Sequence, residues 1–155
     1  MDKYCAVIEF PAMNVGVRTG DETLIGVRYL PRSAPLKVPS SRFAERVVRQ
    51  LERYRDDPDV TFDLPLTIGG TGFQRRVWRV MRKIPRGETR TYGEVAKALD
   101  SAARAVGQAC GENRLPIVIP CHRIIAAGGI GGFGHARGGY LLEAKRWLLG
   151  HERAL

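Results

Sequence analysis

Residues 117–125 (Ile-Val-Ile-Pro-Cys-His-Arg-Ile-Ile) constrain this chain more than any other stretch, because they place polar chemistry inside an apolar run. The β-branched residues before Pro120 predict a short, fully buried strand. Proline has no amide hydrogen to donate and therefore ends that strand. A thiol, an imidazole and a guanidinium follow at once, before the chain returns to isoleucine. We therefore expect Cys121, His122 and Arg123 to lie in a largely hydrophobic setting.

Cys121 has two interpretations. Cysteines without a disulfide partner are usually buried and behave as small apolar side chains. A neighbouring imidazole and guanidinium instead favour the thiolate, which is the nucleophilic form of cysteine. Adjacent side chains point to opposite faces of a strand and diverge by about 100° on a helix. We therefore expect His122 to act on Cys121 through a bridging water or a turn at Pro120, not through a direct hydrogen bond.

The length and composition are those of a globular chain. Its 155 residues suffice for one domain or two small ones, and 44% of them are hydrophobic. The first residues form no signal-peptide region, and no apolar run approaches the roughly 18 residues of a membrane span. Three cysteines without CxxC spacing, at positions 5, 110 and 121, argue for a reducing compartment and against a disulfide framework or a structural zinc site.

Basic residues are concentrated near the middle of the chain. The formal net charge is +9 and the pI is near 10.0. A basic domain suits an anionic partner, which would be nucleic acid first and an acidic membrane surface second. The alternative is that the positive charge only keeps the protein soluble. The clustering favours nucleic acid, because between residues 72 and 90 only Glu88 opposes seven basic residues: Arg75, Arg76, Arg79, Arg82, Lys83, Arg86 and Arg90.

Residues 1–65 predict a small α+β subdomain that carries no recognisable chemistry. Alternating apolar residues and turn signals predict three strands, over 4–10, 14–19 and 23–30, in an antiparallel meander. Ser40 and Ser41 are candidate N-caps for an amphipathic helix over 42–55. A stretch rich in proline and glycine, residues 58–71, then connects this subdomain to the rest of the chain.

Four helices are predicted after this connection, over 72–83, 91–99, 102–110 and 140–149. The second and third, with a break at Asp100-Ser101 that is expected to cap the third, resemble a helix-turn-helix. Helix 102–110 has almost no bulk beyond Arg104 and Gln108. Such a bare helix permits close approach to a narrow DNA groove, with one arginine inserted among the bases. A tightly packed interior helix with Arg104 in solvent is the alternative.

Glycines at positions 129, 131 and 134 spell GxGxxG, but further glycines follow where the dinucleotide fingerprint needs a helix. We therefore exclude a dinucleotide site. The loop is interpreted as a flexible wall beside the thiol, with Phe133 available for stacking.

The C-terminal half carries several motifs in a fixed order. Together they resemble the O6-alkylguanine-DNA alkyltransferases, also called methylated-DNA–protein-cysteine methyltransferases. The resemblance covers about residues 72–152, and it is specific because several spaced motifs agree. Residues 1–65 share only the general character of that family's N-terminal subdomain. The motifs are Phe73-Gln74-x-x-Val77-Trp78, Pro85-x-Gly87-x-x-x-Tyr92-Gly93, Arg104-Ala105-Val106-Gly107, Asn113, Pro120-Cys121-His122-Arg123 and Trp147-Leu148-Leu149-x-His151-Glu152.

The resemblance implies direct repair of DNA by a single, irreversible transfer. The alkyl group of O6-alkylguanine in duplex DNA would pass in line to Cys121, after the damaged nucleotide is flipped out from the minor-groove side. The product is a thioether, which has no leaving group comparable to the alkylated base, so each chain would act once. No cofactor or metal is implied, and the lone N-terminal cysteine, Cys5, lacks the partners that a zinc site would need.

The resemblance also implies a role for each matching residue. His122 would be the base for Cys121 through a water, and Glu152 would orient His122. Tyr92 would donate a hydrogen bond to the departing guanine and help to turn the nucleotide, and Asn113 would brace the active-site turn. Arg104 would fill the space left by the extruded base. Further DNA contacts would come from Gln74, Ala102, Ala103, Ala105 and Gly107, and the lesion pocket from Pro120, Gly132, Phe133 and Gly134.

The predicted fold class is α+β: an N-terminal scaffold over 1–65, then a mostly helical domain over 72–155 with the helix-turn-helix and the cysteine box. We expect a monomer that binds double-stranded DNA carrying O6-alkylguanine, in the cytoplasm and on the nucleoid, with no membrane and no obligate protein partner. Phe133 replaces a tyrosine that relatives often have, and the loop 135–139 is longer, so the accepted lesions are left open. The alternatives are a non-catalytic lesion-binding protein, a cysteine hydrolase and a helix-turn-helix regulator.

Overall fold

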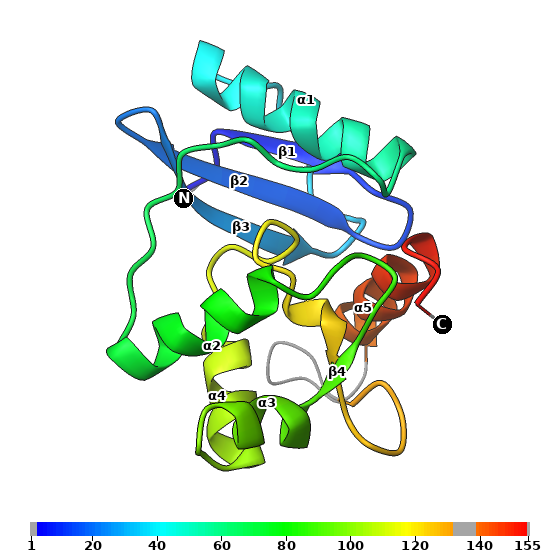
Figure 1. Cartoon of the computed structure of the whole chain (residues 1–155). Coiled ribbons are helices and arrows are strands. Elements are labelled where there is room, and N and C mark those ends of the chain that lie inside the picture. Colours follow the sequence, from blue (N-terminus) through cyan, green and yellow to red (C-terminus); the bar gives the residue numbers. More distant parts are fainter. Residues whose placement is uncertain (1–2, 132–138, 155) are drawn as a thin grey trace. The chain divides into compact units, whose positions relative to one another are not determined.

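The N-terminal strands pair through short turns into a sheet of order β1-β2-β3 (Figure 1). β1 (Ala6–Glu9) is antiparallel to β2 (Asn14–Gly20), which is antiparallel to β3 (Thr23–Leu30). The turn between β2 and β3 places Asp21 and Glu22 at positive φ, as tight hairpin turns require. The predicted antiparallel meander is therefore confirmed, with strand ends shifted by at most two residues.

Helix α1 (Arg42–Asp56) covers one face of this sheet (Figure 1). The Ser41 hydroxyl caps the helix by accepting a hydrogen bond from the Ala44 amide at 3.1 Å, which confirms the predicted N-cap. Apolar residues at helical spacing face the sheet, so helix and strands share one core. The buried residues of α1 are Ala44, Val47, Val48, Leu51 and Tyr54.

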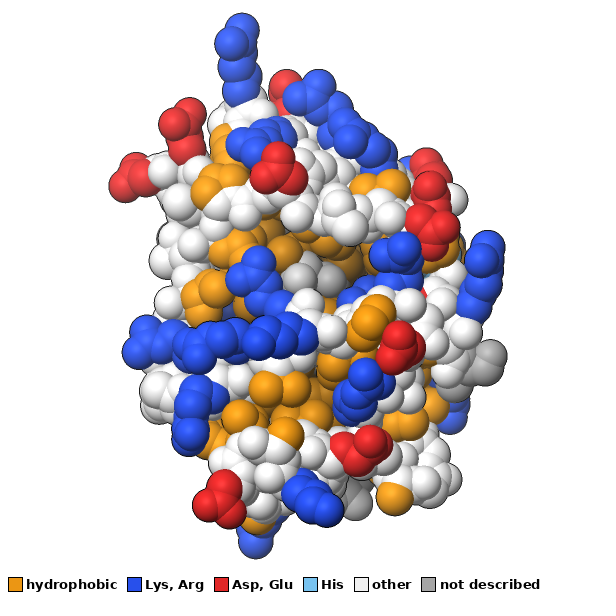
Figure 2. All heavy atoms as spheres, viewed as in Figure 1, with side chains coloured by type: hydrophobic (Ala, Val, Ile, Leu, Met, Phe, Trp, Pro, Cys, Tyr) orange, Lys and Arg blue, Asp and Glu red, His pale blue; other side chains and the backbone are white. Residues whose placement is uncertain are grey.

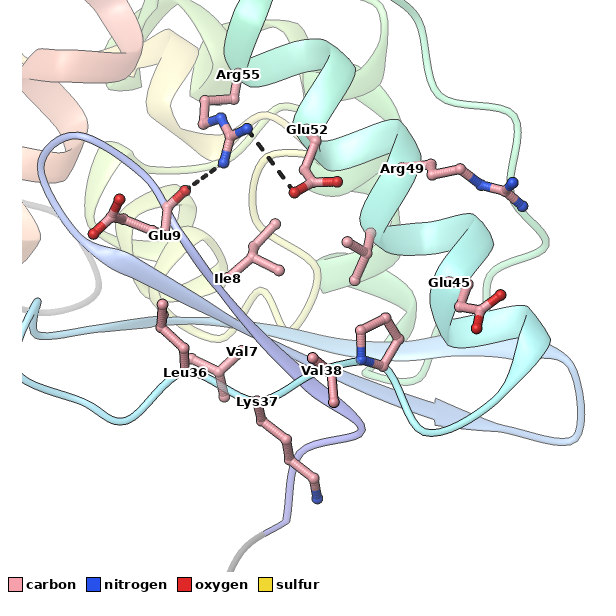
Figure 3. A pocket seen from close by; sticks show the side chains of 12 residues that line it. Val7, Ile8, Glu9, Leu36, Lys37, Val38, Glu45, Arg49, Glu52 and Arg55 are labelled. Carbon is pink, nitrogen blue, oxygen red and sulfur yellow. Dashed lines mark hydrogen bonds and ion pairs between the residues drawn. The ribbon is translucent and has the colours of Figure 1, made fainter.

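A groove of about 580 Å³ runs between α1 and residues 36–39 (Figure 3). Residues 36–39 lie along β1, where Val7 and Lys37 exchange two backbone hydrogen bonds of 3.0 Å. Leu36 and Val38 are largely exposed there. None of the residues to which the sequence assigns chemistry lines this groove.

The C-terminal elements are helical except for one short parallel strand pair (Figure 1). Helix α2 (Gly72–Arg82) comes first, followed by strand β4 (Arg90–Thr91), helices α3 (Tyr92–Ala98) and α4 (Ala103–Gly111), the 3₁₀ turn η1 (Cys121–Arg123), strand β5 (Ile124–Ile125) and helix α5 (Gly139–His151). Strands β4 and β5 pair residue 90 with 124 and residue 91 with 125. This pairing places the start of α3 beside the end of the cysteine box.

Two local predictions are wrong. Residues 117–119 form a turn, not a strand, because Ile119 donates its amide to the Leu115 carbonyl at 2.8 Å and Ile117 takes a positive φ of 74°. The isoleucines are still buried, so burial was inferred correctly and extended geometry was not. The N-cap of α4 is Ala102, which has no side-chain cap, whereas Asp100 takes a positive φ of 53° in the preceding turn.

The structure describes residues 3–131 and 139–154, and contacts within the chain group into two units, residues 1–68 and 69–155. The first unit contains the sheet and α1. The second contains α2 to α5 and the cysteine box. Within the described ranges, no helix combines the length and the apolar character that crossing a membrane demands.

Candidate active site

Cys121 begins the turn η1 and is buried, with 5% of its surface exposed. Its amide donates to the Ile119 carbonyl at 2.8 Å, and its carbonyl accepts from the Ile124 amide. Pro120 cannot continue a ladder and instead turns the chain into η1. The turn thus holds Cys121 in the interior on a fixed backbone.

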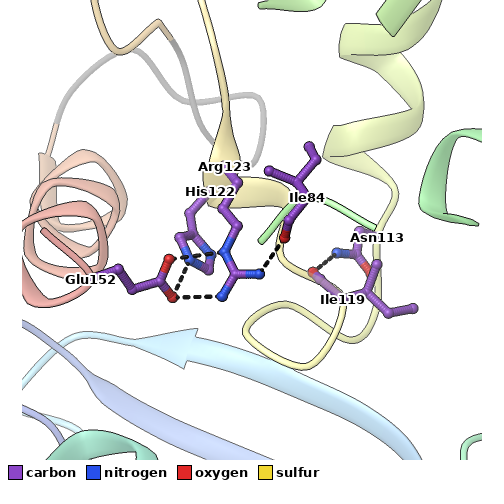
Figure 4. Close-up of polar contacts among 6 residues, drawn as sticks. All are labelled: Ile84, Asn113, Ile119, His122, Arg123 and Glu152. Carbon is purple, nitrogen blue, oxygen red and sulfur yellow. Dashed lines mark hydrogen bonds and ion pairs between the residues drawn. The ribbon is translucent and has the colours of Figure 1, made fainter. Parts of the chain in front are cut away.

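His122 and Glu152 form a buried pair (Figure 4). Nε2 of His122 lies 2.8 Å from Oε2 of Glu152, and neither side chain is exposed to solvent. The other ring nitrogen, Nδ1, is buried and has no hydrogen-bond partner among the described residues. Burial is the main reason that the pKa of His122 lies below its ordinary value, so the ring is neutral at pH 7.

Arg123 binds the same carboxylate and so fixes it in place (Figure 4). Its Nε donates to Oε1 of Glu152 at 2.9 Å, and one terminal nitrogen donates to Oε2 at 3.1 Å. The other terminal nitrogen donates to the Ile84 carbonyl at 2.7 Å. This two-point geometry is the strong form of an arginine–carboxylate pair. Arg123 therefore holds the Glu152 carboxylate and makes no hydrogen bond to the thiol.

Glu152 owes its position to the end of α5. Arg153 has a positive φ of 61°, and the amide of Ala154 donates back to the Leu149 carbonyl at 2.8 Å. The Arg153 amide also donates to the Gly150 carbonyl at 3.0 Å. This pattern is a Schellman motif, which stops the helix at a defined residue. The carboxylate is therefore delivered to His122 and Arg123 from a rigid helix end.

The Cys121 thiol keeps its proton at neutral pH. Burial raises the pKa of Cys121 to about 11, although a hydrogen bond with Asn113 and the charge of Lys145 lower it. The sequence suggested that the neighbouring imidazole and guanidinium would favour the thiolate. Desolvation instead dominates the pKa of the thiol, and the Arg123 guanidinium is bound to Glu152. Forming the thiolate at neutral pH would need a base beside this thiol.

Asn113 holds the two sides of the turn that leads to Cys121 (Figure 4). Its amide nitrogen donates to the Ile119 carbonyl at 2.9 Å, and its side-chain oxygen accepts from the Leu115 amide at 2.9 Å. The Ile119 carbonyl also accepts from the Cys121 amide, and the Asn113 side chain hydrogen-bonds to the thiol itself. Asn113 therefore contacts Cys121 directly and also through Ile119.

Tyr92 and Lys145 complete the cluster around the thiol. Tyr92 is the first residue of α3, and burial raises its pKa to about 12, so the phenol remains a hydrogen-bond donor. Lys145 of α5 is fully buried; its Nζ donates to the Ile124 carbonyl at 2.8 Å and lies 5.7 Å from the centre of the Tyr92 ring. Burial lowers the pKa of Lys145 to about 8.

Sequence reasoning missed Lys145 and Cys110. Cys110, on α4, and Cys121 both influence the pKa values of Tyr92 and Lys145, which places the two thiols in one cluster. The signal for Lys145 was present in the sequence, because it lies at helical spacing between Leu142 and Leu149 on the buried face of α5. A lysine inside an apolar stripe is either paired or functional.

The predicted DNA-binding residues lie mostly on exposed surface of α4. Ala102, Ala103 and Arg104 are exposed, whereas Ala105 and Gly107 are partly buried. Val106 and Ala109 face the core, so one side of α4 is packed and the side with Ala102, Ala103 and Arg104 is exposed. Gln74 lies apart, at the start of α2, where its side-chain oxygen accepts from the Thr71 amide at 2.9 Å. This capping box explains its position without reference to DNA.

The predicted lesion pocket is described only in part. Pro120 is buried directly before Cys121, while Gly132, Phe133 and Gly134 lie outside the described residues. The adjoining Gly131 approaches Tyr92 closely: a Cβ added there would meet Cε2 of Tyr92 at 3.2 Å, and its φ is 75°. Gly131 therefore lies directly against the Tyr92 ring.

A profile of known sequences decides the family. The profile described as "6-O-methylguanine DNA methyltransferase, DNA binding domain" matches residues 72–154, which is more than half of the chain. The chain belongs to the 6-O-methylguanine DNA methyltransferase family.

Relatives and solved structures of this family cover most of the chain. A methylated-DNA–protein-cysteine methyltransferase of Methanosarcina acetivorans is 39% identical over 81% of this chain and 85% of its own length. One from Mycolicibacterium paratuberculosis is 49% identical over 68% of this chain and 63% of its own length. The crystal structure of the Mycobacterium tuberculosis O6-methylguanine methyltransferase superposes with a TM-score of 0.80 at 34% identity, covering 96% and 91% of the two chains. A structure of the same bacterium's OGT in complex with DNA also gives 0.80, at 36% identity.

These matches confirm the predicted family, the α+β fold class and the methyltransferase activity. Direct repair of alkylated DNA is thereby favoured over a non-catalytic lesion-binding protein. The matches assign no role to individual residues of this chain.

Proposed function

We propose that this methyltransferase takes the alkyl group of O6-alkylguanine in duplex DNA onto Sγ of Cys121, once per chain. The observation that carries the proposal is the buried His122 ring, which is neutral, bound through Nε2 to Glu152 and unpartnered at Nδ1 among the described residues. A buried thiol with a pKa of about 11 needs such a base next to it.

The proton route follows from the hydrogen-bond roles of the two residues. A carboxylate only accepts hydrogen bonds, so Nε2 of His122 carries the hydrogen and Nδ1 carries the lone pair. In the proposed reaction a water passes the Cys121 proton to Nδ1. Glu152 then stabilises the imidazolium, and Arg123 keeps the carboxylate aimed at the ring.

Bond making and breaking occur at one carbon. The Cys121 sulfur forms a bond to the alkyl carbon while the bond from that carbon to guanine O6 breaks, and the electron pair leaves with the base. Tyr92 donates a hydrogen bond to the departing guanine, because a phenol with a pKa of about 12 keeps its hydrogen. Asn113 holds the turn that aims the sulfur.

DNA is bound through α3 and α4 in this proposal. Exposed alanines and a partly buried glycine let the backbone of α4 approach a minor groove, and the exposed Arg104 fills the gap left by the flipped nucleotide. Flipping costs a few kcal/mol, and less for a weakened pair, so damaged guanine is selected. Ala102, Ala103, Ala105 and Gly107 form the contact surface, and Gln74 adds a contact from α2.

The proposal also covers the state of the protein. We infer a monomer that acts in the cytoplasm and on the nucleoid, with residues 1–65 as a scaffold and residues 72–155 as the DNA-binding and alkyl-acceptor domain. The two contact units and the placement of all the proposed catalytic residues after residue 69 support this division.

Mass spectrometry after incubation with a duplex that contains O6-methylguanine tests the proposal. We expect one methyl group per chain, on the peptide that contains Cys121, and none on Cys121→Ser. The matched control is Cys110→Ser, which removes the neighbouring thiol and should still be methylated. Lesion binding without added mass would favour the non-catalytic alternative, and repeated turnover of an ester or amide would favour a hydrolase.

A further inference from the structure

The outward face of α2 carries a cluster of cations that the proposed reaction does not use. Every one of these side chains is exposed, and among the described residues none forms an ion pair with a carboxylate. Arg76 alone has a ring contact, with its guanidinium 5.6 Å from the centre of the Phe73 ring. The cluster, called here the α2 cationic face, consists of Arg75, Arg76, Arg79, Arg82 and Lys83.

These charges repel one another. Like charges three or four residues apart on a helix destabilise it, and Arg75, Arg79 and Lys83 succeed one another at that spacing. The sequence of α2 contains no acidic residue that could offset the repulsion. Helix α1 is different, because its arginines are interspersed with Glu45, Glu52 and Asp56. A bound anion would relieve the repulsion on α2.

The α2 cationic face points away from α4. Val77, Trp78 and Met81 form the buried side of α2, and Nε1 of Trp78 donates to the Ala109 carbonyl of α4 at 2.8 Å. The basic residues occupy the opposite side of the helix. Figure 2 shows Lys and Arg side chains in a row across the part of the surface where Figure 1 places α2. A duplex held against the exposed side of α4 therefore leaves this face uncovered.

We propose that the α2 cationic face binds the phosphate backbone of a second DNA duplex, separate from the one that α3 and α4 hold. Arginine matches the geometry of phosphate oxygens through paired N–H donors. Arg75, Arg79 and Arg82 span about 10 Å along the helix, at ~1.5 Å per residue. That length corresponds to about three phosphates at ~3.4 Å of axial rise each along one strand.

A membrane surface fits this face less well. Helices that lie on a bilayer insert an apolar face beside their basic one. The apolar side of α2, formed by Val77, Trp78 and Met81, is instead buried in the protein core. The proposal rests on the proposed function only in taking DNA as the partner.

The dependence of binding on salt tests the face directly. Lesion-free duplex is titrated against wild type, against R75Q/R79Q/R82Q and against a control, R42Q/R49Q/R53Q, that removes three exposed arginines from α1. In these titrations the α2 variant should lose about 2 to 3 units from the slope of log K against log salt, at ~0.9 per phosphate contact, and the α1 variant less than one unit. R75K/R79K/R82K keeps the charge and should restore most of the slope. Equal losses in the α1 and α2 variants would overturn the proposal, because total charge would then suffice.

Bridging between duplexes tests whether the second duplex is separate. Two short duplexes, one with a donor dye and one with an acceptor dye, are mixed with protein at less than one chain per duplex. Energy transfer should appear with wild type and be lost in R75Q/R79Q/R82Q. Its absence with wild type would overturn the proposal even if the salt slopes differ, since the contacts would then lie on one duplex. Methylation of Cys121 in the wild type reports separately on the proposed function.

Discussion

At the level of single residues, the proposed mechanism couples a thiol that resists ionisation to a base that resists protonation. Burial raises the pKa of Cys121 to about 11 and lowers that of His122 below its ordinary value. Between these two values the thiol and the imidazole hold one proton in total, so their ability to exchange it does not change with pH. In the proposed mechanism Glu152 keeps the exchange at Nδ1 by binding Nε2 of His122, and Arg123 holds the Glu152 carboxylate in place.

The rate of methyl transfer should therefore be independent of pH over a wide range. For wild type we expect a plateau from pH 8 down to the ordinary histidine pKa of 6.5, with a decline only below it, because the His122 pKa is depressed. In His122→Asn the rate at pH 7 should fall by about 10² or more, the usual contribution of a general base. The rate should also rise about tenfold per pH unit, following the thiolate fraction.

Single-turnover kinetics from pH 5.5 to 8.5 provide the measurement. His151→Asn is the control, since it removes the other described imidazole of this unit, which stacks on the Trp147 ring. A wild-type rate that is already halved above pH 6.5 would contradict the role given to His122.

Arg104 should matter for duplex and not for the free base. Arg104→Ala should slow transfer from duplex about tenfold, equivalent to ~1.4 kcal/mol, because nothing would then fill the vacated stack. Transfer from free O6-alkylguanine needs no flipping and should not change. Arg114→Ala removes another exposed arginine of the same unit and is the control. Equal losses on both substrates would exclude Arg104 from base extrusion.

At the scale of elements, two helices begin with the same device. Thr71 caps α2 and Thr91 caps α3, each in a reciprocal box with a side chain three residues later. The α3 cap matters more for chemistry, because Tyr92 is the next residue and β4 ties this point to the cysteine box. The α2 cap lies farther along the chain from Tyr92.

Removing either cap should destabilise the protein to a similar extent. Thr71→Ala and Thr91→Ala should each cost ~1 kcal/mol, the usual value of an N-cap, as measured by chemical denaturation. Only Thr91→Ala should also slow methyl transfer, because the Thr91 cap fixes the first turn of α3, which begins with Tyr92. If both variants react equally fast after correction for the folded fraction, the α3 cap does not position Tyr92.

At the scale of the whole molecule, the net charge of +9 governs the encounter with DNA. Electrostatic steering raises association rates and is screened by salt. We expect the association rate constant with duplex, measured by stopped-flow fluorescence, to fall by about tenfold or more as salt rises from low to high ionic strength. The methyl-transfer rate at saturating duplex should change far less. An association rate that is insensitive to salt would contradict steering.

Many local features of this protein follow from its sequence alone. Period-two strands, the helix starts at Ser41 and Thr91 and the buried character of residues 117–125 each follow from neighbouring residue types, whose preferences act over a few positions. The order of motifs around Cys121 indicated the family, which the relatives confirm.

The partners of the polar groups in the site, by contrast, depend on the tertiary structure. Arg123 lies two residues after Cys121 in the sequence, yet it binds Glu152 at the C-terminal end of α5. Lys145 reaches the same cluster from the middle of α5. Residues 117–119 turn because the Ile119 amide bonds to the Leu115 carbonyl. Burial and pairing depend on residues distant in sequence, and these set the pKa of Cys121 against the expectation from its neighbours.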